Sequence, residues 1–119
     1  MRLIYHLSPV DEYKSVPPDQ PYRPGAFARD GFIHCTRGVE QLVIVANRYY
    51  RNDPRPLVVV VIDESRVTAE IKYEPGKEDG VSYPHIYGPL NRDAIITVLN
   101  MGRLSDGSFQ FPDRYETRT

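Results

Sequence analysis

The 119-residue sequence predicts an α+β fold: a compact single domain with a curved or split mixed β-sheet and two main helices. Short apolar runs rich in β-branched and aromatic residues recur along the chain, which is typical of strands. Two segments carry helix signals, and stretches rich in proline or glycine separate the elements. The length corresponds to one domain, and a domain of this size buries roughly two-thirds of the surface of its unfolded chain.

The first third of the chain is expected to hold a strand, a short helix and a long loop. Residues 1–7 are predicted to form the first strand. Ser8 is followed by two acidic residues and predicts a helix start, because its hydroxyl can cap free N–H groups and acids suit the first turn. Pro17 and Pro18 end this helix. The stretch 17–30, rich in proline, then predicts an ordered but irregular loop.

A strand over 31–35 and the longest helix, over 37–51, are expected next. The helix prediction rests on apolar residues that repeat at three- and four-residue spacing, with Thr36 as a plausible cap. In a strand over 31–35, Cys35 and His34 would point to opposite faces. We therefore interpret Cys35 as a small buried hydrophobic residue and not as a nucleophile.

The second half of the chain predicts strands joined by turns. The continuous β-branched run 57–63 is typical of a strand that is covered on both faces. Further strands are expected at 69–74, around His85, at 94–101 and, as an edge strand, within 103–111. The domain is expected to span residues 1–112, with 113–119 as a flexible C-terminal tail.

Composition restricts the classes of function. The net charge of −1 provides no basic field of the kind that nucleic-acid binding needs, so we expect no broad nucleic-acid surface. No run of about 18 apolar residues occurs and no signal peptide begins the chain, so no membrane association is expected. Cys35 is the only cysteine, so no internal disulfide can form and a cytoplasmic location is predicted.

The three histidines of the chain, His6, His34 and His85, all lie in short apolar runs. A histidine on an apolar strand is usually a partly buried residue whose ring nitrogens are satisfied by backbone groups. Here a Tyr or Phe lies close to each histidine, and a small residue follows within three positions. Aromatic rings with small neighbours suit a planar ligand, so the histidines are candidates to line a cleft.

Several motifs occur in the order found in one bacterial family. They are Ile4-Tyr5-His6, Gly31-Phe32-Ile33-His34-Cys35-Thr36, Gln41, Ala46-Asn47, Ile62-Asp63, Glu74-Pro75 and Pro84-His85-Ile86-Tyr87-Gly88-Pro89-Leu90. Over residues 3–98 the chain resembles the family known as domain of unknown function 952. That family in turn resembles, more distantly, the ADP-ribosyltransferase fold of bacterial toxins, poly-ADP-ribose polymerases and RNA 2′-phosphotransferases. The resemblance implies an ADP-ribosyltransferase-like fold.

The resemblance also implies roles for candidate residues. In that fold the first strand ends in a residue that contacts the NAD ribose or phosphate, and His6 is in the similar position. A second strand of that fold holds the nicotinamide side of NAD. The segment that contains Phe32, His34 and Thr36 is similar to this strand. The third element normally supplies a Glu, and here His85 occupies it. A neutral imidazole can act as a base near neutral pH, but it supplies no fixed negative charge.

The leading hypothesis is a cleft that binds NAD, ADP-ribose or a related phosphorylated nucleotide, with His6, His34 and His85 as catalytic candidates. The chemistry implied is transfer of an ADP-ribosyl group or of a 2′-phosphate. Four further residues are candidate ligand contacts: Tyr5 and Tyr87 to stack a base or the nicotinamide, and Arg29 or Arg92 to pair with a phosphate.

Two alternatives from other classes stay open at this point. Three imidazoles plus a water would suit catalytic zinc, with Asp63 or Glu74 as a carboxylate behind the ligands, although the spacing carries no short-range metal motif. The chain could also be a non-enzymatic interaction domain. The sequence leaves the oligomeric state undetermined.

Overall fold

Strand β3 (Leu57–Asp63) lies in the middle of the fold, and all 7 of its residues are buried. The computed structural model describes residues 2–77 and 79–112. β3 pairs antiparallel with β1 (Leu3–Pro9) on one side and with β6 (Ile95–Asn100) on the other. The continuous β-branched run therefore forms the doubly covered strand that the sequence predicted.

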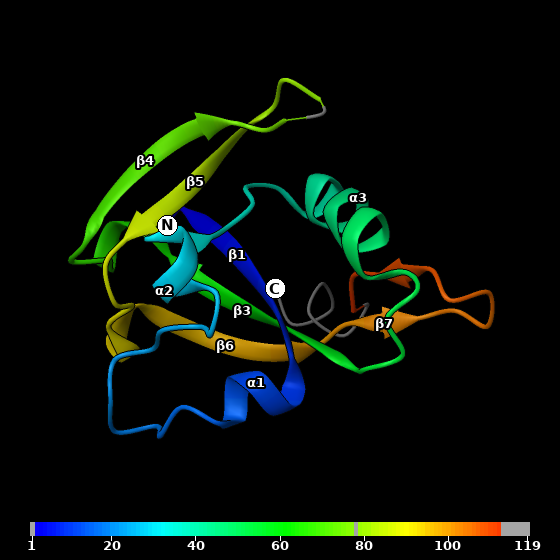
Figure 1. Ribbon diagram of the computed structural model, residues 1–119, viewed down its shortest axis with the longest axis horizontal. Coiled ribbons are helices and arrows are strands. Elements are labelled where there is room, and N and C mark those ends of the chain that lie inside the picture. The colour runs from blue at the N-terminus through cyan, green and yellow to red at the C-terminus, as the bar shows by residue number, and fades with distance from the viewer. Residues whose placement is uncertain (1, 78, 113–119) are drawn as a thin grey trace.

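A second sheet stands beside the first, so the sheet is split (Figure 1). It contains β2 (Ile33–His34), β5 (Ser82–Tyr87) and β4 (Glu70–Pro75), in that order. The two sheets meet at a bridge between Tyr5 and Thr36, whose backbone groups exchange two hydrogen bonds of 2.8 Å. The architecture is the predicted compact α+β domain.

All strand pairs within residues 2–77 and 79–112 are antiparallel, so the prediction of a mixed sheet is wrong. The short turn between β4 and β5 permits only antiparallel pairing, because parallel neighbours need a crossover of a dozen or more residues. The segment that contains helix α3 (Val39–Tyr50) is long enough for such a crossover. It leads, however, from β2 in one sheet to β3 in the other.

Of the two main helices predicted, only α3 is long. Helix α1 (Val10–Lys14) has 5 residues, and the loop that follows contains the 4-residue helix α2 (Phe27–Asp30). Two 3-10 turns, η1 (Glu64–Arg66) and η2 (Arg92–Ala94), lie after β3 and before β6. No helix among the described residues is long and apolar enough to cross a membrane.

Both predicted helix caps are wrong. Ser8 belongs to β1, where its hydroxyl donates a 2.9 Å hydrogen bond to the carbonyl of Pro9, and Pro9 immediately precedes α1. Thr36 is held in the bridge to Tyr5. Gly38 instead precedes α3 with a φ of 92°, a left-handed backbone that glycine adopts without steric cost.

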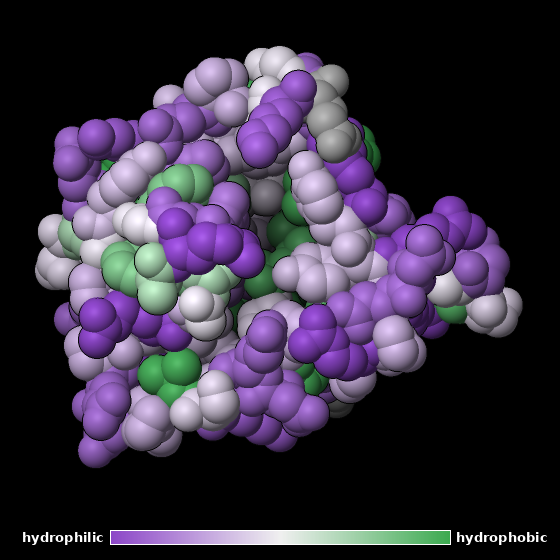
Figure 2. All heavy atoms as spheres, in the orientation of Figure 1, coloured by the Kyte–Doolittle hydropathy of each residue, from purple (hydrophilic) through white to green (hydrophobic). Residues whose placement is uncertain are grey.

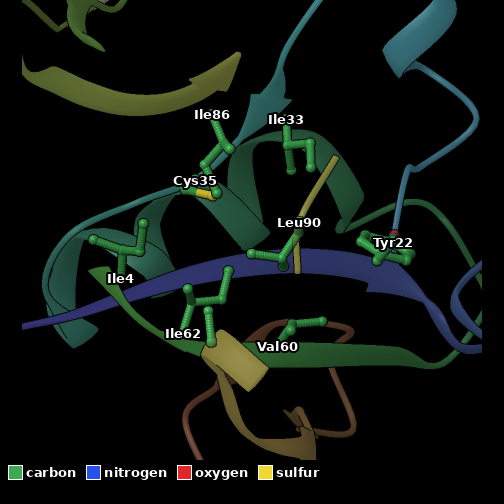
Figure 3. Packing of buried hydrophobic residues seen from close by; sticks show 9 residues of the cluster. Ile4, Tyr22, Ile33, Cys35, Val60, Ile62, Ile86 and Leu90 are labelled. Atoms are coloured by element: carbon green, nitrogen blue, oxygen red, sulfur yellow. The ribbon is translucent and has the colours of Figure 1, made fainter. Parts of the chain in front are cut away.

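Side chains alternate along β1 and β3 and divide the core in two. One cluster lies between the two sheets and contains Cys35, which is 3% exposed, so its predicted burial is confirmed. The strand predicted over 31–35 is shorter, however, and Cys35 follows the end of β2. The members labelled in Figure 3 are Ile4, Tyr22, Ile33, Cys35, Val60, Ile62, Ile86 and Leu90. On the opposite face of β1 and β3, Tyr5, Val59 and Val61 pack in a second cluster with α3.

A C-terminal hairpin completes this second cluster. Strands β7 (Gly102–Arg103) and β8 (Phe109–Gln110) pair antiparallel where a single edge strand was expected. The backbone N–H of Phe109 donates a 2.7 Å hydrogen bond to the side chain of Asn47 on α3, which fixes the hairpin against the helix. Residues 113–119, the predicted tail, lie outside the described residues.

Because β3 is central and buried, a cavity created in this strand should lower the free energy of unfolding by a large amount. Replacing the fully buried Ile62 with alanine should lower the free energy of unfolding by about 2–5 kcal/mol. The matched change Ile96→Ala on β6 removes the same atoms from a residue that is 42% exposed, and should cost about 1 kcal/mol or less. Urea unfolding measures both, and equal losses would contradict the burial of β3.

Candidate functional site

Four aromatic rings gather on the outer face of the second sheet. Along β5, Ile86 points into the core, so His85 and Tyr87 point to the other face. His34 of β2 is the cross-strand partner of His85, and their ring centroids are 5.3 Å apart. Phe32 stacks on His85 at a centroid distance of 4.1 Å and an interplanar angle of 19°. We call Phe32, His34, His85 and Tyr87 the ring cluster.

Glu74 of the neighbouring strand β4 binds two members of the ring cluster. Its Oε1 atom lies 2.7 Å from Nδ1 of His85 and accepts a 2.5 Å hydrogen bond from the hydroxyl of Tyr87. The hydrogen bond from Tyr87 is the largest cause that lowers the pKa of Glu74, and the one from His85 is the second. In turn, the carboxylate of Glu74 raises the pKa of Tyr87. Because an ionised carboxylate only accepts, the Nδ1 of His85 carries the proton and Nε2 remains as the open nitrogen.

Asp30, the last residue of α2, binds His34 in the corresponding way. The Asp30 Oδ2 atom lies 2.8 Å from Nε2 of His34, which leaves Nδ1 as the open nitrogen of that ring. Hydrogen bonds from Arg29 first, and then from His34, lower the pKa of Asp30 to about 2. Gly31 directly after α2 has a φ of 80°, and this left-handed turn leads the chain from Asp30 into Phe32.

His6 lies beneath the ring cluster and not within it. Its side chain is buried, and Nδ1 lies 2.7 Å from the carbonyl oxygen of His34, to which it must donate. Nε2 lies 3.2 Å from the hydroxyl of Tyr22 and can only accept from it. Burial lowers the pKa of His6 to about 4. Near neutral pH, His6 is therefore an uncharged imidazole, and both of its ring nitrogens make hydrogen bonds.

Tyr5 and Thr36, two further predicted contacts, are buried at the junction of the sheets. The Tyr5 ring belongs to the cluster under α3 and meets the ring of Phe111 edge-on, with centroids 5.7 Å apart. Thr36 is 4% exposed. The structure brings neither side chain to the ring cluster.

The predicted phosphate ligand Arg92 is engaged elsewhere. Its guanidinium donates to the carbonyl of Gln20 at 2.6 Å, to the carbonyl of Pro17 at 3.0 Å and to the hydroxyl of Tyr13 at 3.1 Å. It also lies 5.7 Å from the ring centroid of Tyr22. Arg92 thus holds the proline-rich loop in place, and none of these contacts is with a residue of the ring cluster.

Two cations do lie beside the ring cluster. Arg29 pairs with Asp30 at 2.9 Å, and its side chain is 78% exposed. Lys72 of β4 is the cross-strand partner of His85, and its Nζ lies 4.8 Å from the ring centroid of Tyr87. Of the two arginines predicted to meet a phosphate, only Arg29 is placed next to the predicted histidines.

Sequence reasoning missed the two carboxylates that orient the histidines. Asp30 precedes His34 by four residues, but the turn at Gly31 that brings them together has no simple periodic signal. The sequence suggests a role for Glu74 only as a carboxylate behind a metal ligand. Its contact with His85 depends on the register of β4 against β5, in which Lys72 pairs with His85. A prediction of this hairpin with its register would have found Glu74.

The surface next to Tyr87 is hollowed. An open depression of about 410 Å³ is lined by Pro21, Thr68, Ala69, Tyr87, Gly88, Pro89 and Asn91. Figure 2 shows a further hollow between α2 and α3, with hydrophobic atoms at its bottom. The ring cluster therefore adjoins a concave, mainly apolar surface through Tyr87.

The geometry does not favour the three-histidine metal site. Both nitrogens of His6 are engaged in hydrogen bonds inside the protein. Within the described part of the chain, no group of three or more His, Cys, Asp or Glu side chains is placed to hold a metal ion.

Comparison with known families identifies the chain. A family model described as "Protein of unknown function (DUF952)" matches residues 7–98. The chain belongs to the DUF952 family. No curated protein matches this DUF952 protein.

The fold is similar to that of solved structures of CC0527 from Caulobacter crescentus. Its crystal structure is 23% identical in sequence, has a TM-score of 0.80, and the match covers 96% of this chain and 98% of that chain. A solution NMR structure of CC0527 is 24% identical, with a TM-score of 0.75 and coverage of 96% and 97%. At this level of identity the likeness establishes the shared fold.

The burial of neutral His6 predicts a specific pH dependence. The pKa of His6 falls from 6.5 to about 4 on folding. Between these values the unfolded chain binds a proton that the folded chain does not, so stability is lost as the pH falls, by about 3 kcal/mol in total. We predict that His6→Asn, which does not titrate, removes this part of the loss.

Urea unfolding of wild type and His6→Asn at several pH values from 7 to 4 measures this difference. The stability of the variant relative to wild type should rise as the pH falls. Identical pH dependence of the two proteins would contradict the burial of a neutral imidazole at this position.

Proposed function

We propose that this DUF952 protein binds a small planar ligand that carries phosphate, with NAD, ADP-ribose or a related nucleotide as the expected ligand. The observation that carries the proposal is the ring cluster itself. It presents two imidazoles, each with one nitrogen open, beside the rings of Phe32 and Tyr87 on the outer face of a sheet. Such a group of rings and open polar atoms suits stacking and hydrogen bonding of a base.

The adjoining surface supports a ligand of this size. The depression next to Tyr87 falls in the lower part of the range of about 300–1,000 Å³ typical of small-molecule sites. Arg29 and Lys72 supply positive charge on the two sides of the ring cluster. We assign the phosphate contact to these two residues and not to Arg92.

The roles of the three histidines differ in this proposal. His34 and His85 face the ligand, and His6 acts from below by holding the backbone of His34 in place. The distant resemblance to the ADP-ribosyltransferase fold favours transfer of an ADP-ribosyl group or a 2′-phosphate as the chemistry. Glu74 then provides, from the neighbouring strand, a carboxylate at the position where His85 replaces the usual Glu. We also propose a cytoplasmic location, which is consistent with the single cysteine, Cys35.

The proposal predicts that Phe32→Ala weakens nucleotide binding. Stacking of a base on an aromatic ring contributes about 1–3 kcal/mol, so the Kd for the best ligand among NAD, ADP-ribose and 2′-phosphorylated nucleotides should rise at least about fivefold. Isothermal titration calorimetry with wild type and variant measures this change.

Two controls make the binding experiment decisive. Tyr49→Ala removes a ring that is 60% exposed on α3 and should leave the Kd unchanged. Tyr87→Phe keeps the ring and removes only its hydrogen bond to Glu74, so it should retain most of the affinity. Absence of binding to wild type at millimolar nucleotide, or a Phe32→Ala variant that binds as wild type does, would overturn the proposal.

A further inference from the structure

His34 and His85 form a pair in which each imidazole is oriented by its own carboxylate. Asp30 holds His34 through Nε2 at 2.8 Å, and Glu74 holds His85 through Nδ1 at 2.7 Å. The two rings are cross-strand neighbours with centroids 5.3 Å apart. The carboxylates come from different elements, α2 and β4, so neither contact is a by-product of the other.

The carboxylates leave one defined nitrogen open on each ring. These are Nδ1 of His34 and Nε2 of His85, neither of which has a hydrogen-bond partner within residues 2–77 and 79–112. A carboxylate behind an imidazole fixes its tautomer and stabilises the imidazolium that forms when the open nitrogen takes up a proton. Two such imidazoles side by side can act together, one as general base and one as general acid.

We propose that this pair hydrolyses a phosphate diester, an inference that rests on the proposed binding of a phosphorylated ligand at the ring cluster. Neutral His34 removes a proton from water through Nδ1 as the water oxygen forms a bond to phosphorus. The bond from phosphorus to the leaving alcohol oxygen breaks, and protonated His85 donates its Nε2 proton to that oxygen. One diester and one water give one phosphate monoester and one alcohol, and solvent returns the two imidazoles to their starting protonation states.

The surroundings of each ring decide these two roles. The side chain of His34 is 58% exposed, so bulk water reaches this ring. The side chain of His85 is 13% exposed and is covered by the stacked ring of Phe32. A leaving group that carries a base is held against Phe32 and Tyr87, which places its oxygen on the side of His85.

Two cationic side chains, Lys72 and Arg29, lie near the residues that orient the pair. Attack on a phosphate diester increases the negative charge on the phosphate oxygens, and fixed cations stabilise that charge. The Nζ atom of Lys72 lies over the ring of Tyr87, and Lys72 is the cross-strand partner of His85. Arg29 is the exposed partner of Asp30 on the side of His34.

Hydrolysis of bis(p-nitrophenyl) phosphate and of a nucleoside 2′,3′-cyclic phosphate by purified protein, in buffer with a chelator, tests the proposal. Wild type should release product above the protein-free rate. His34→Gln and His85→Gln should each lower kcat by on the order of a hundredfold, as is typical for loss of a general acid or base. Tyr49→Ala, on the exposed side of α3, should retain the wild-type rate.

Variants of the carboxylates separate this role from a structural one. Asp30→Asn and Glu74→Gln keep the size of each side chain and should lower kcat by on the order of tenfold, with thermal melting that stays close to that of wild type. No product from wild type, or equal rates for wild type and both histidine variants, would overturn the proposal. Nucleotide binding without hydrolysis would overturn it and leave the proposed function standing, whereas hydrolysis without nucleotide binding would contradict the proposed function.

Discussion

The 2.7 Å hydrogen bond from His6 to the carbonyl oxygen of His34 joins the two sheets at the point where the candidate site is built. β2 contains only 2 residues, so its own pairing with β5 is a weak support. The bridge between Tyr5 and Thr36 adds two backbone hydrogen bonds next to it. Together these contacts hold the segment from Phe32 to Thr36 against β1, and the positions of the outward rings depend on them.

This arrangement separates the histidines by role. His6 is buried and neutral, and its two internal hydrogen bonds offset the free energy that burying a polar ring costs. His34 and His85 are oriented by carboxylates on the outer face of the second sheet. The same strand alternation that places Ile33 and Ile86 in the core directs both imidazoles outward. The candidate site is therefore a direct consequence of packing the second sheet on β1 and β3.

Features with a regular period could be predicted from the sequence, and features set by tertiary contacts could not. The strand β3 follows from its continuous apolar run, and α3 follows from an apolar stripe with a period of 3.6 residues. The contacts of Asp30 and Glu74 depend on a left-handed turn at Gly31 and on the register of the β4–β5 hairpin. Likewise, nothing local to Arg92 indicates that distant backbone carbonyls would engage its guanidinium.

The central claim is that His34 and His85 face the ligand while His6 supports them. NMR detection of the imidazole nitrogens, with and without saturating NAD or ADP-ribose, tests it most directly. The account predicts that Nδ1 is protonated in His6 and His85 and Nε2 in His34, and that the ligand shifts only the His34 and His85 signals. A ligand-induced shift confined to His6, or no shift of any histidine on saturation, would contradict it.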